Sequence, residues 1–73
     1  MASQLLIKQL SARSWSIGGL QEHEPVMVYD LQGRLVQKER AQSGETVLNL
    51  SHLPKGIYII NINNKRTIKI QLN

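Results

Sequence analysis

Alternation of apolar and polar residues with a period of two is the feature that most limits how this chain can fold. It is clearest at residues 66–73, where Ile68, Ile70 and Leu72 alternate with polar side chains. Successive side chains of a β-strand point to opposite faces, so such a segment lies with one face on a core and the other in water. A helical period fits only residues 5–10, which have no convincing capping residue. The sequence therefore predicts an all-β protein.

Other segments also have the composition of β-strands. Residues 57–62 and 26–29 consist largely of β-branched, aromatic and other apolar residues, which predicts central strands covered on both faces. Shorter or more polar segments, which are typical of sheet edges, are residues 35–39 and 46–50. Weaker strand candidates are residues 4–9 and 14–17. About seven short strands, separated by turn residues at regular spacing, predict a small immunoglobulin-like β-sandwich.

Glycine and asparagine mark the turns between these segments. Residues 30–33 form a predicted tight turn that closes on Gly33, because glycine can take the positive φ of a bulged hairpin. Residues 42–45 and 63–65 separate the next strands, and asparagine also tolerates left-handed geometry. No repeat, linker or low-complexity stretch interrupts the pattern. We therefore expect one all-β domain over residues 1–73, a fragment of a longer protein that starts without a secretion-signal pattern.

The composition argues against an enzyme. The chain has 73 residues with no cysteine, two histidines and five carboxylates, which leaves little material for an active site. A chain this short buries only about 60% of its unfolded surface, and neither a disulfide nor a thiolate metal site reinforces its thin core. His23 and His52 lack metal-ligand spacing, and no serine has a recognisable base. We expect no catalytic residue, no metal and no cofactor, and Trp15 should fill the core or an edge.

The net charge of +4 belongs to the last third of the chain. The charges of residues 1–50 cancel, whereas the cations of residues 51–73 stand without an acid: Lys55, Lys65, Arg66 and Lys69. A basic end can attract an anionic glycolipid, an acidic protein surface or nucleic acid. Scattered cations and few aromatic residues argue against nucleic acid. A solvated strand face is the simpler interpretation, because Lys and Arg are usually exposed.

The most specific stretch is residues 51–58 (SHLPKGIY). Pro54 fixes φ and donates no hydrogen bond, so it is expected to terminate the strand before it. Gly56 permits a conformation closed to residues with a Cβ. The Tyr58 ring can enter the core if its hydroxyl finds an acceptor, such as a backbone carbonyl a few residues upstream. This is the pattern of a tyrosine corner, where the chain of an immunoglobulin-like sandwich crosses between sheets.

Three features occur here in the order seen in a known family. Residues 28–36 read VYDLQGRLV, residues 44–60 read GETVLNLSHLPKGIYII, and an alternating strand with Lys69 ends the chain. Over about residues 26–72 the sequence resembles the type A C-terminal sorting domain of the type IX secretion system of Bacteroidetes. Many members of that family begin with a Pro-Asn-Pro element, which residues 1–17 lack.

The resemblance implies a non-catalytic signal domain. Such a domain directs its cargo protein through the outer membrane, by way of the periplasm, to the cell surface or the medium. The implied partners are the outer-membrane translocon, shuttle proteins and a sortase, and anionic lipopolysaccharide would be linked to the cargo rather than bound by the domain. Carried over by position, the residues expected to serve recognition are Gly33, Leu53, Pro54, Gly56, Tyr58, Lys69 and Ile70.

The final strand suggests how docking could occur. A strand at a sheet edge has unpaired backbone groups, so a partner can add a strand to it. Lys69, beside Lys65 and Arg66, would steer the encounter; alternatively these cations only keep the edge soluble. The same edge could pair two copies into a homodimer. The alternative function is a retained adhesion or receptor-like module that binds protein or anionic glycolipid.

Overall fold

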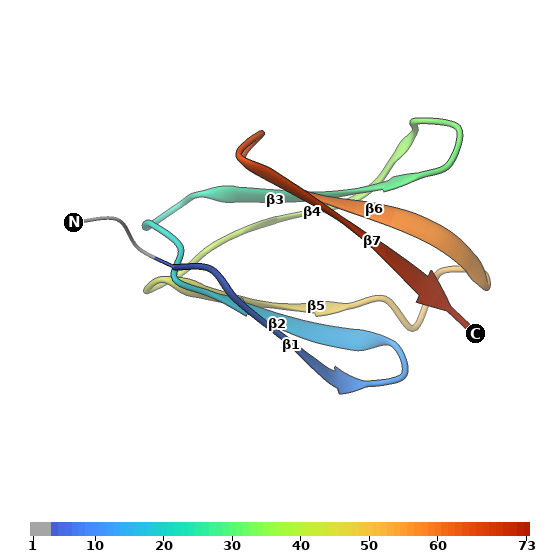
Figure 1. Ribbon diagram of the computed structural model, residues 1–73, viewed down its shortest axis with the longest axis horizontal. Helices are drawn as coiled ribbons and strands as arrows, with labels where there is room; N and C mark the ends of the chain where they lie inside the picture. The colour runs from blue at the N-terminus through green and yellow to red at the C-terminus, as the bar shows by residue number, and fades with distance from the viewer. Residues whose placement is uncertain (1–3) are drawn as a thin grey trace.

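Seven strands form two antiparallel sheets in the computed structural model, which describes residues 4–73 (Figure 1). The strands are β1 (Leu6–Ser11), β2 (Ser14–Gly18), β3 (Pro25–Asp30), β4 (Leu35–Arg40), β5 (Glu45–Asn49), β6 (Gly56–Ile62) and β7 (Arg66–Leu72). One sheet has the order β1-β2-β5 and the other the order β4-β3-β6-β7. The predicted small all-β sandwich is confirmed. Within residues 4–73 no helix has the length and hydropathy of a membrane span.

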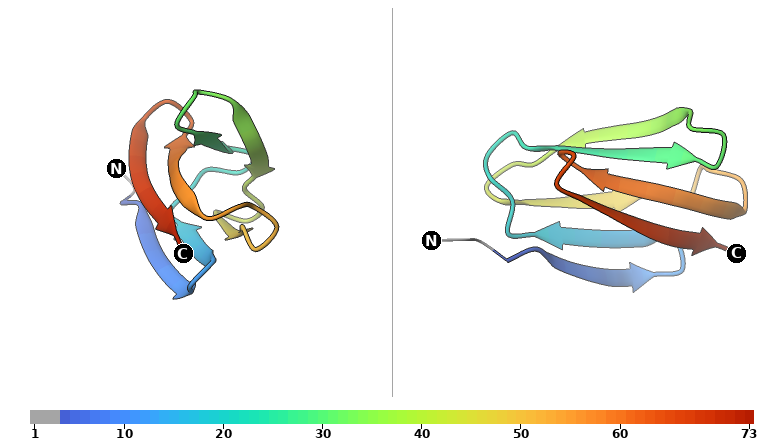
Figure 2. Two further views of the ribbon diagram at one scale, coloured as in Figure 1. Left: turned by 90° about the vertical axis from the view of Figure 1, so that its right-hand side faces the viewer. Right: turned by 45° about the horizontal axis from the view of Figure 1, so that its top comes forward.

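The predicted positions of the central and edge strands are also confirmed. In the larger sheet β3 and β6 are central, while β4 and β7 form the edges (Figure 2). In the smaller sheet β5 is an edge and β2 is central. The signal of β2 was weak because Ser14, Ser16 and Gly18 point outward and only Trp15 and Ile17 are buried. Residues 5–10, the one segment with a helical period, contribute to strand β1 instead.

The turn between β3 and β4 has the predicted bulged form. Gly33 has φ 83°, and its N–H donates to the Asp30 carbonyl at 3.0 Å. The Asp30 carboxylate accepts the N–H groups of Gln32 and Arg34 at 2.9 Å each, and the Arg34 guanidinium at 2.7 Å. The strand register shifts between Val28 and Tyr29, as a bulge requires. The Asp30 carboxylate and Gly33 therefore both shape this turn.

The core lies between the inward faces of both sheets. Its largest fully buried side chains come from five strands and one connection: Ile17, Leu48, Leu50, Ile60, Ile62, Leu72, Val26 and Val28. Trp15 and Tyr58 add their rings to this cluster. Buried residues alternate with half-buried or exposed ones along β3, β6 and β7, so the period of two of a β-strand decides which residues form the core.

One prediction about the chain between β5 and β6 was wrong. β5 ends at Asn49, and residues 50–55 intervene before β6, so Pro54 does not terminate the strand. The strand ends in a turn, because the Ser51 N–H donates to the side chain of Asn49 at 3.0 Å and the Leu53 N–H donates to the Leu50 carbonyl at 3.1 Å. These bonds turn the chain away from the small sheet, and residues 50–55 then carry it across to the larger one.

Candidate recognition surface

The corner between β5 and β6 has the predicted tyrosine lock. The Tyr58 side chain is buried, with 6% of the residue exposed, and its hydroxyl donates to the Pro54 carbonyl at 2.7 Å. Tyr58 pairs with Asp30 on β3 and with Ile70 on β7, so it lies on a central strand of the larger sheet. The corner is thereby tied to the sheet that carries the final strand.

The loop of the corner has a defined shape. Leu53 packs against the core and donates its N–H to the Leu50 carbonyl at 3.1 Å, whereas Pro54 is exposed. Gly56 has φ 151°, a backbone conformation that residues with a Cβ rarely adopt. Leu53 thus anchors the loop, Gly56 permits its return into β6, and Pro54 lies at the surface.

Arg13 fastens this loop to the end of the chain. From the turn between β1 and β2, its guanidinium donates to the Leu53 carbonyl and, at 2.9 Å, to the Asn73 carbonyl. Its own carbonyl accepts the Leu50 N–H. The planar fork of arginine suits two acceptors at once. Sequence reasoning missed this residue, because its acceptors lie 40 and 60 residues away and are backbone atoms that no motif marks.

Most of the predicted recognition residues lie at one end of the sandwich. The turn with Gly33, the corner loop and the C-terminus are all at the right-hand end of Figure 1, together with the turn that contains Arg13. Gly33 belongs to a separate turn and is exposed, with no atom near the position of a Cβ. The structure therefore gathers the corner residues and the chain end into one unit and leaves the Gly33 turn beside it.

The last two predicted residues point in opposite directions from β7. Lys69 is exposed on the outer face of the larger sheet, opposite Ile59. Ile70 is 8% exposed and belongs to the core, opposite Tyr58. Among the described residues β7 pairs with β6 alone, so one backbone edge of the strand has no neighbouring strand. The charge of Lys69 and unpaired backbone N–H and C=O groups thus occur together on β7.

Lys65, which was expected to lie on a solvated face, has a specific partner. Its ammonium lies 2.7 Å from the carboxylate of Glu24, whose side chain is only 4% exposed. That carboxylate also accepts the Asn63 amide at 2.9 Å and the Gln21 N–H at 3.0 Å. The hydrogen bond from Lys65, followed by those from Asn63 and Gln21, lowers the pKa of Glu24 to about 2. The charge of Lys65 is therefore compensated, and it is not a free cation beside Lys69.

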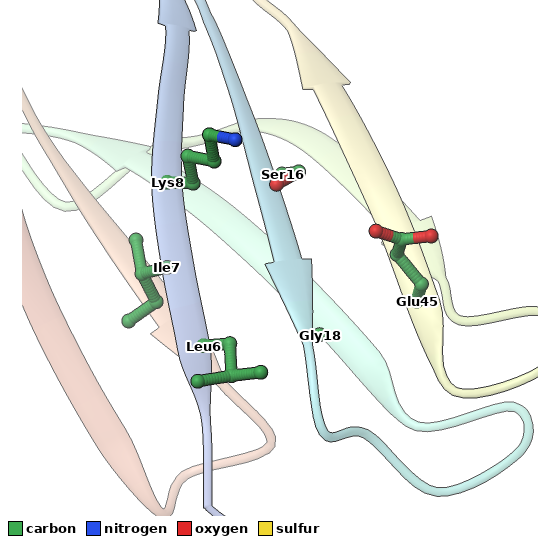
Figure 3. A pocket seen from close by; sticks show the side chains of 6 residues that line it. All are labelled: Leu6, Ile7, Lys8, Ser16, Gly18 and Glu45. Atoms are coloured by element: carbon green, nitrogen blue, oxygen red, sulfur yellow. The ribbon is translucent and has the colours of Figure 1, made fainter.

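Metal-ligating and nucleophilic side chains were the other candidates for a functional site. Within residues 4–73 no three histidine, aspartate or glutamate side chains gather as metal ligands. A hollow of about 490 Å³ lies on the smaller sheet (Figure 3). Its charged groups, Lys8 and Glu45, come from the two edge strands, with Ser16 between them on β2. The lining holds no histidine that could activate this serine.

The sandwich, its tyrosine corner and its lysine-bearing final strand define a small sorting module. The family model for the secretion system C-terminal sorting domain matches residues 7–72, and the chain belongs to that family. No curated protein and no solved structure gives a significant match. The family match begins in β1 and so includes the N-terminal strands that the motif resemblance left out.

Membership of this family establishes the coarse function. The domain is a C-terminal sorting signal for type IX secretion, which directs its cargo protein through the outer membrane to the cell surface or the extracellular space. Its function involves interaction with the type IX machinery. The family consists of sorting signals rather than known catalysts, and the match lends no support to the adhesion alternative.

Proposed function

We propose that the domain has no catalytic activity and is itself the ligand that the secretion machinery reads after the cargo has reached the periplasm. The outer-membrane translocon, with its shuttle proteins and sortase, is the proposed reader. Lipopolysaccharide would be joined to the cargo by the sortase rather than bound by this domain. One observation carries the proposal: β7 is an edge strand with Lys69 exposed on it, next to a corner that has a fixed shape.

Strand addition to β7 is the proposed mode of docking. A partner strand would pair with the free backbone edge, which supplies affinity without reading particular side chains. Lys69 would steer the partner and set its register through charge. Ile70 contributes by holding β7 on the core, and the residues from Leu53 to Tyr58 contribute by fixing the corner. Gly33 would act through the shape of its turn.

A reporter fusion tests this proposal. Residues 1–73 are placed behind a signal peptide and a fluorescent protein in a host with a working type IX system, and in a mutant that lacks the translocon. We expect the reporter at the surface or in the medium only in the first host. We also expect less export of the Lys69→Ala variant. Lys8→Ala is the matched control, because Lys8 is exposed on an edge strand of the other sheet.

Both variants must be shown to fold, by thermal unfolding of the purified domain, before export is compared. Retention of the folded wild-type domain in the periplasm would contradict the proposed function. Equal export of the two lysine variants would contradict the role of Lys69 while leaving the sorting function intact.

The free edge also supports a second proposal, a homodimer through β7. An exposed edge strand is a template for pairing with another chain. Two copies paired at β7 would form one continuous sheet across the dimer. Sedimentation of the purified domain should then show a shift from monomer to dimer as concentration rises, and a monomer at high concentration would contradict this pairing.

A further inference from the structure

The outer face of the larger sheet combines charge and apolar surface in a way that the linear sequence conceals. The strand registers place the following outward residues on it: Pro25, Met27, Tyr29, Leu35, Lys38, Arg40, Ile57, Ile59, Asn61, Thr67, Lys69 and Gln71. Three of these are cations and none is acidic. The face looks away from the core, and its strands run side by side in the right-hand view of Figure 2.

The carboxylates nearest in sequence to Lys38 all point elsewhere. Asp30 turns into its own hairpin, where it holds Arg34. Glu39 stands opposite the fully buried Val26 and so belongs to the inward side of β4. Glu45 lies on the other sheet, at the hollow of Figure 3. The charges of residues 26–50 cancel in sequence, yet the fold places two of their three cations, Lys38 and Arg40, on this face and all three acids away from it.

The cations of this face lie on its edge strands, and apolar side chains lie on its central strands. Lys38 lies on the edge strand β4 and Lys69 on the opposite edge strand β7. Three strand spacings separate these strands, which corresponds to about 14 Å. Between them lie half-buried apolar side chains from β3 and β6, including Met27 and Tyr29, whose hydroxyl donates to the Met27 sulfur at 3.4 Å. An apolar centre bordered by exposed cations is the general anatomy of a protein interface.

The outer face of the smaller sheet has a different character. Its central strand presents Ser14, Ser16 and Gly18, and its edge strands carry one cation and one acid, Lys8 and Glu45. The two charges cancel, so this face has no net attraction for an acidic partner. Of the two outer faces, that of the larger sheet therefore carries the net positive charge.

We infer that the outer face of the larger sheet docks a protein surface that presents carboxylates, spaced to meet Lys38 and Lys69, around an apolar patch. The inference rests on the proposed function and names the face of the domain that the secretion machinery contacts. An anionic membrane fits this face less well. Basic clusters that bind anionic lipid usually contain about 4–8 cations, whereas this face has three. Met27, Tyr29 and Ile59 at the centre of the face are half-buried, which limits the apolar surface that could insert into lipid.

Site-specific photo-crosslinking tests which face makes the contact. A photoreactive residue replaces Leu35 or Ile57 on the proposed face, or Val47 on the smaller sheet as a control; these residues are 51%, 37% and 52% exposed. Each is introduced into the reporter fusion in a host with a working type IX system. We expect the first two sites to crosslink to a protein subunit of the translocon complex and the control site not to crosslink.

Charge reversal tests the proposed chemistry of the partner. Lys38→Glu combined with Lys69→Glu should reduce the crosslink from position 35 or 57 roughly tenfold or more, because like charges then face each other. Lys8→Glu, which reverses a charge on the other sheet, should leave it unchanged. All three lysines are exposed, so the variants should keep the wild-type unfolding temperature, which is measured first.

Each other outcome counts against the inference. Equal crosslinking from position 47, an undiminished crosslink after charge reversal, or a crosslink to lipopolysaccharide in place of protein would overturn the proposed face or partner while export of the reporter continued. Failure of the unmodified reporter to leave the cell would contradict the proposed function itself, and this inference with it.

Discussion

Replacing Glu24 with Gln should lower the stability of the domain in a way that depends on pH. The Glu24 carboxylate is almost fully buried and accepts hydrogen bonds from Lys65, Asn63 and the backbone of Gln21. A glutamine keeps the shape of the side chain but removes the charge that these donors face. It also turns an amide N–H₂ group toward the ammonium or the amide that the carboxylate satisfied.

The magnitude follows from the pKa of Glu24, which falls from 4.5 to about 2 on folding, chiefly through the hydrogen bond from Lys65. A shift of this size corresponds to about 3 kcal/mol if it acts in full. The Lys65 side chain is 57% exposed, so solvent screens the pair, and we expect about 1–2 kcal/mol. Because the folded pKa is depressed, this contribution is present above pH 5 and is lost as the pH falls through about 2.

Urea denaturation followed by fluorescence of Trp15, the single tryptophan, measures the effect, since this ring is buried in the folded state. The free energy of unfolding should differ between wild type and Glu24→Gln by about 1–2 kcal/mol at pH 7, and the difference should shrink as the pH falls from 5 toward 2. Glu22→Gln is the control, because the Glu22 side chain is 74% exposed and should change stability by less than about 0.5 kcal/mol. A difference between wild type and Glu24→Gln that does not vary with pH would refute the assigned role of the charge.

Other predictions concern the end of the sandwich with the tyrosine corner. Tyr58→Phe should cost about 0.5–1.5 kcal/mol, because it removes only the hydrogen bond to Pro54. Tyr58→Ala should cost about 3–5 kcal/mol because it leaves a cavity in the core, and unchanged stability of Tyr58→Phe in urea denaturation would contradict the role of the hydroxyl. Arg13→Ala should cost about 1–2 kcal/mol and raise amide hydrogen exchange in the corner loop, without rescue by Arg13→Lys, which lacks the planar fork. Gly33→Ala should cost about 1 kcal/mol through its positive φ alone, and Gly33→Asn should cost less when the unfolding temperatures are compared.

Much of the fold could be predicted because its information is local. Alternation along residues 66–73 identified the final strand, and the apolar run at residues 57–62 identified a central one. The tyrosine lock was also predictable, since Pro54, Gly56 and Tyr58 lie within one short segment and the geometry of a corner limits which carbonyl the hydroxyl can reach.

The partners of charged side chains could not be predicted in the same way. Glu24 meets Lys65 across 41 positions of the chain, and Arg13 reaches Asn73 across 60. Neither pair has a sequence pattern, because packing of the two sheets decides which loops meet at each end of the sandwich. The ending of β5 was misplaced for a local reason, since a turn at Asn49 and Ser51 ends this strand and Pro54 does not.

The sequence by itself determined which residues enter the core, where the chain turns and to which family it belongs. These properties depend on side-chain period, on backbone freedom at a few residues and on the order of short motifs. Only the tertiary structure decided where the charge acts. In the folded protein, Glu24 neutralises the charge of Lys65. Lys38, from a segment whose charges cancel in the sequence, lies on the same face as Lys69. The physical reason is that electrostatic interaction depends on distance in space and on the side of a sheet, and neither follows from position along the chain.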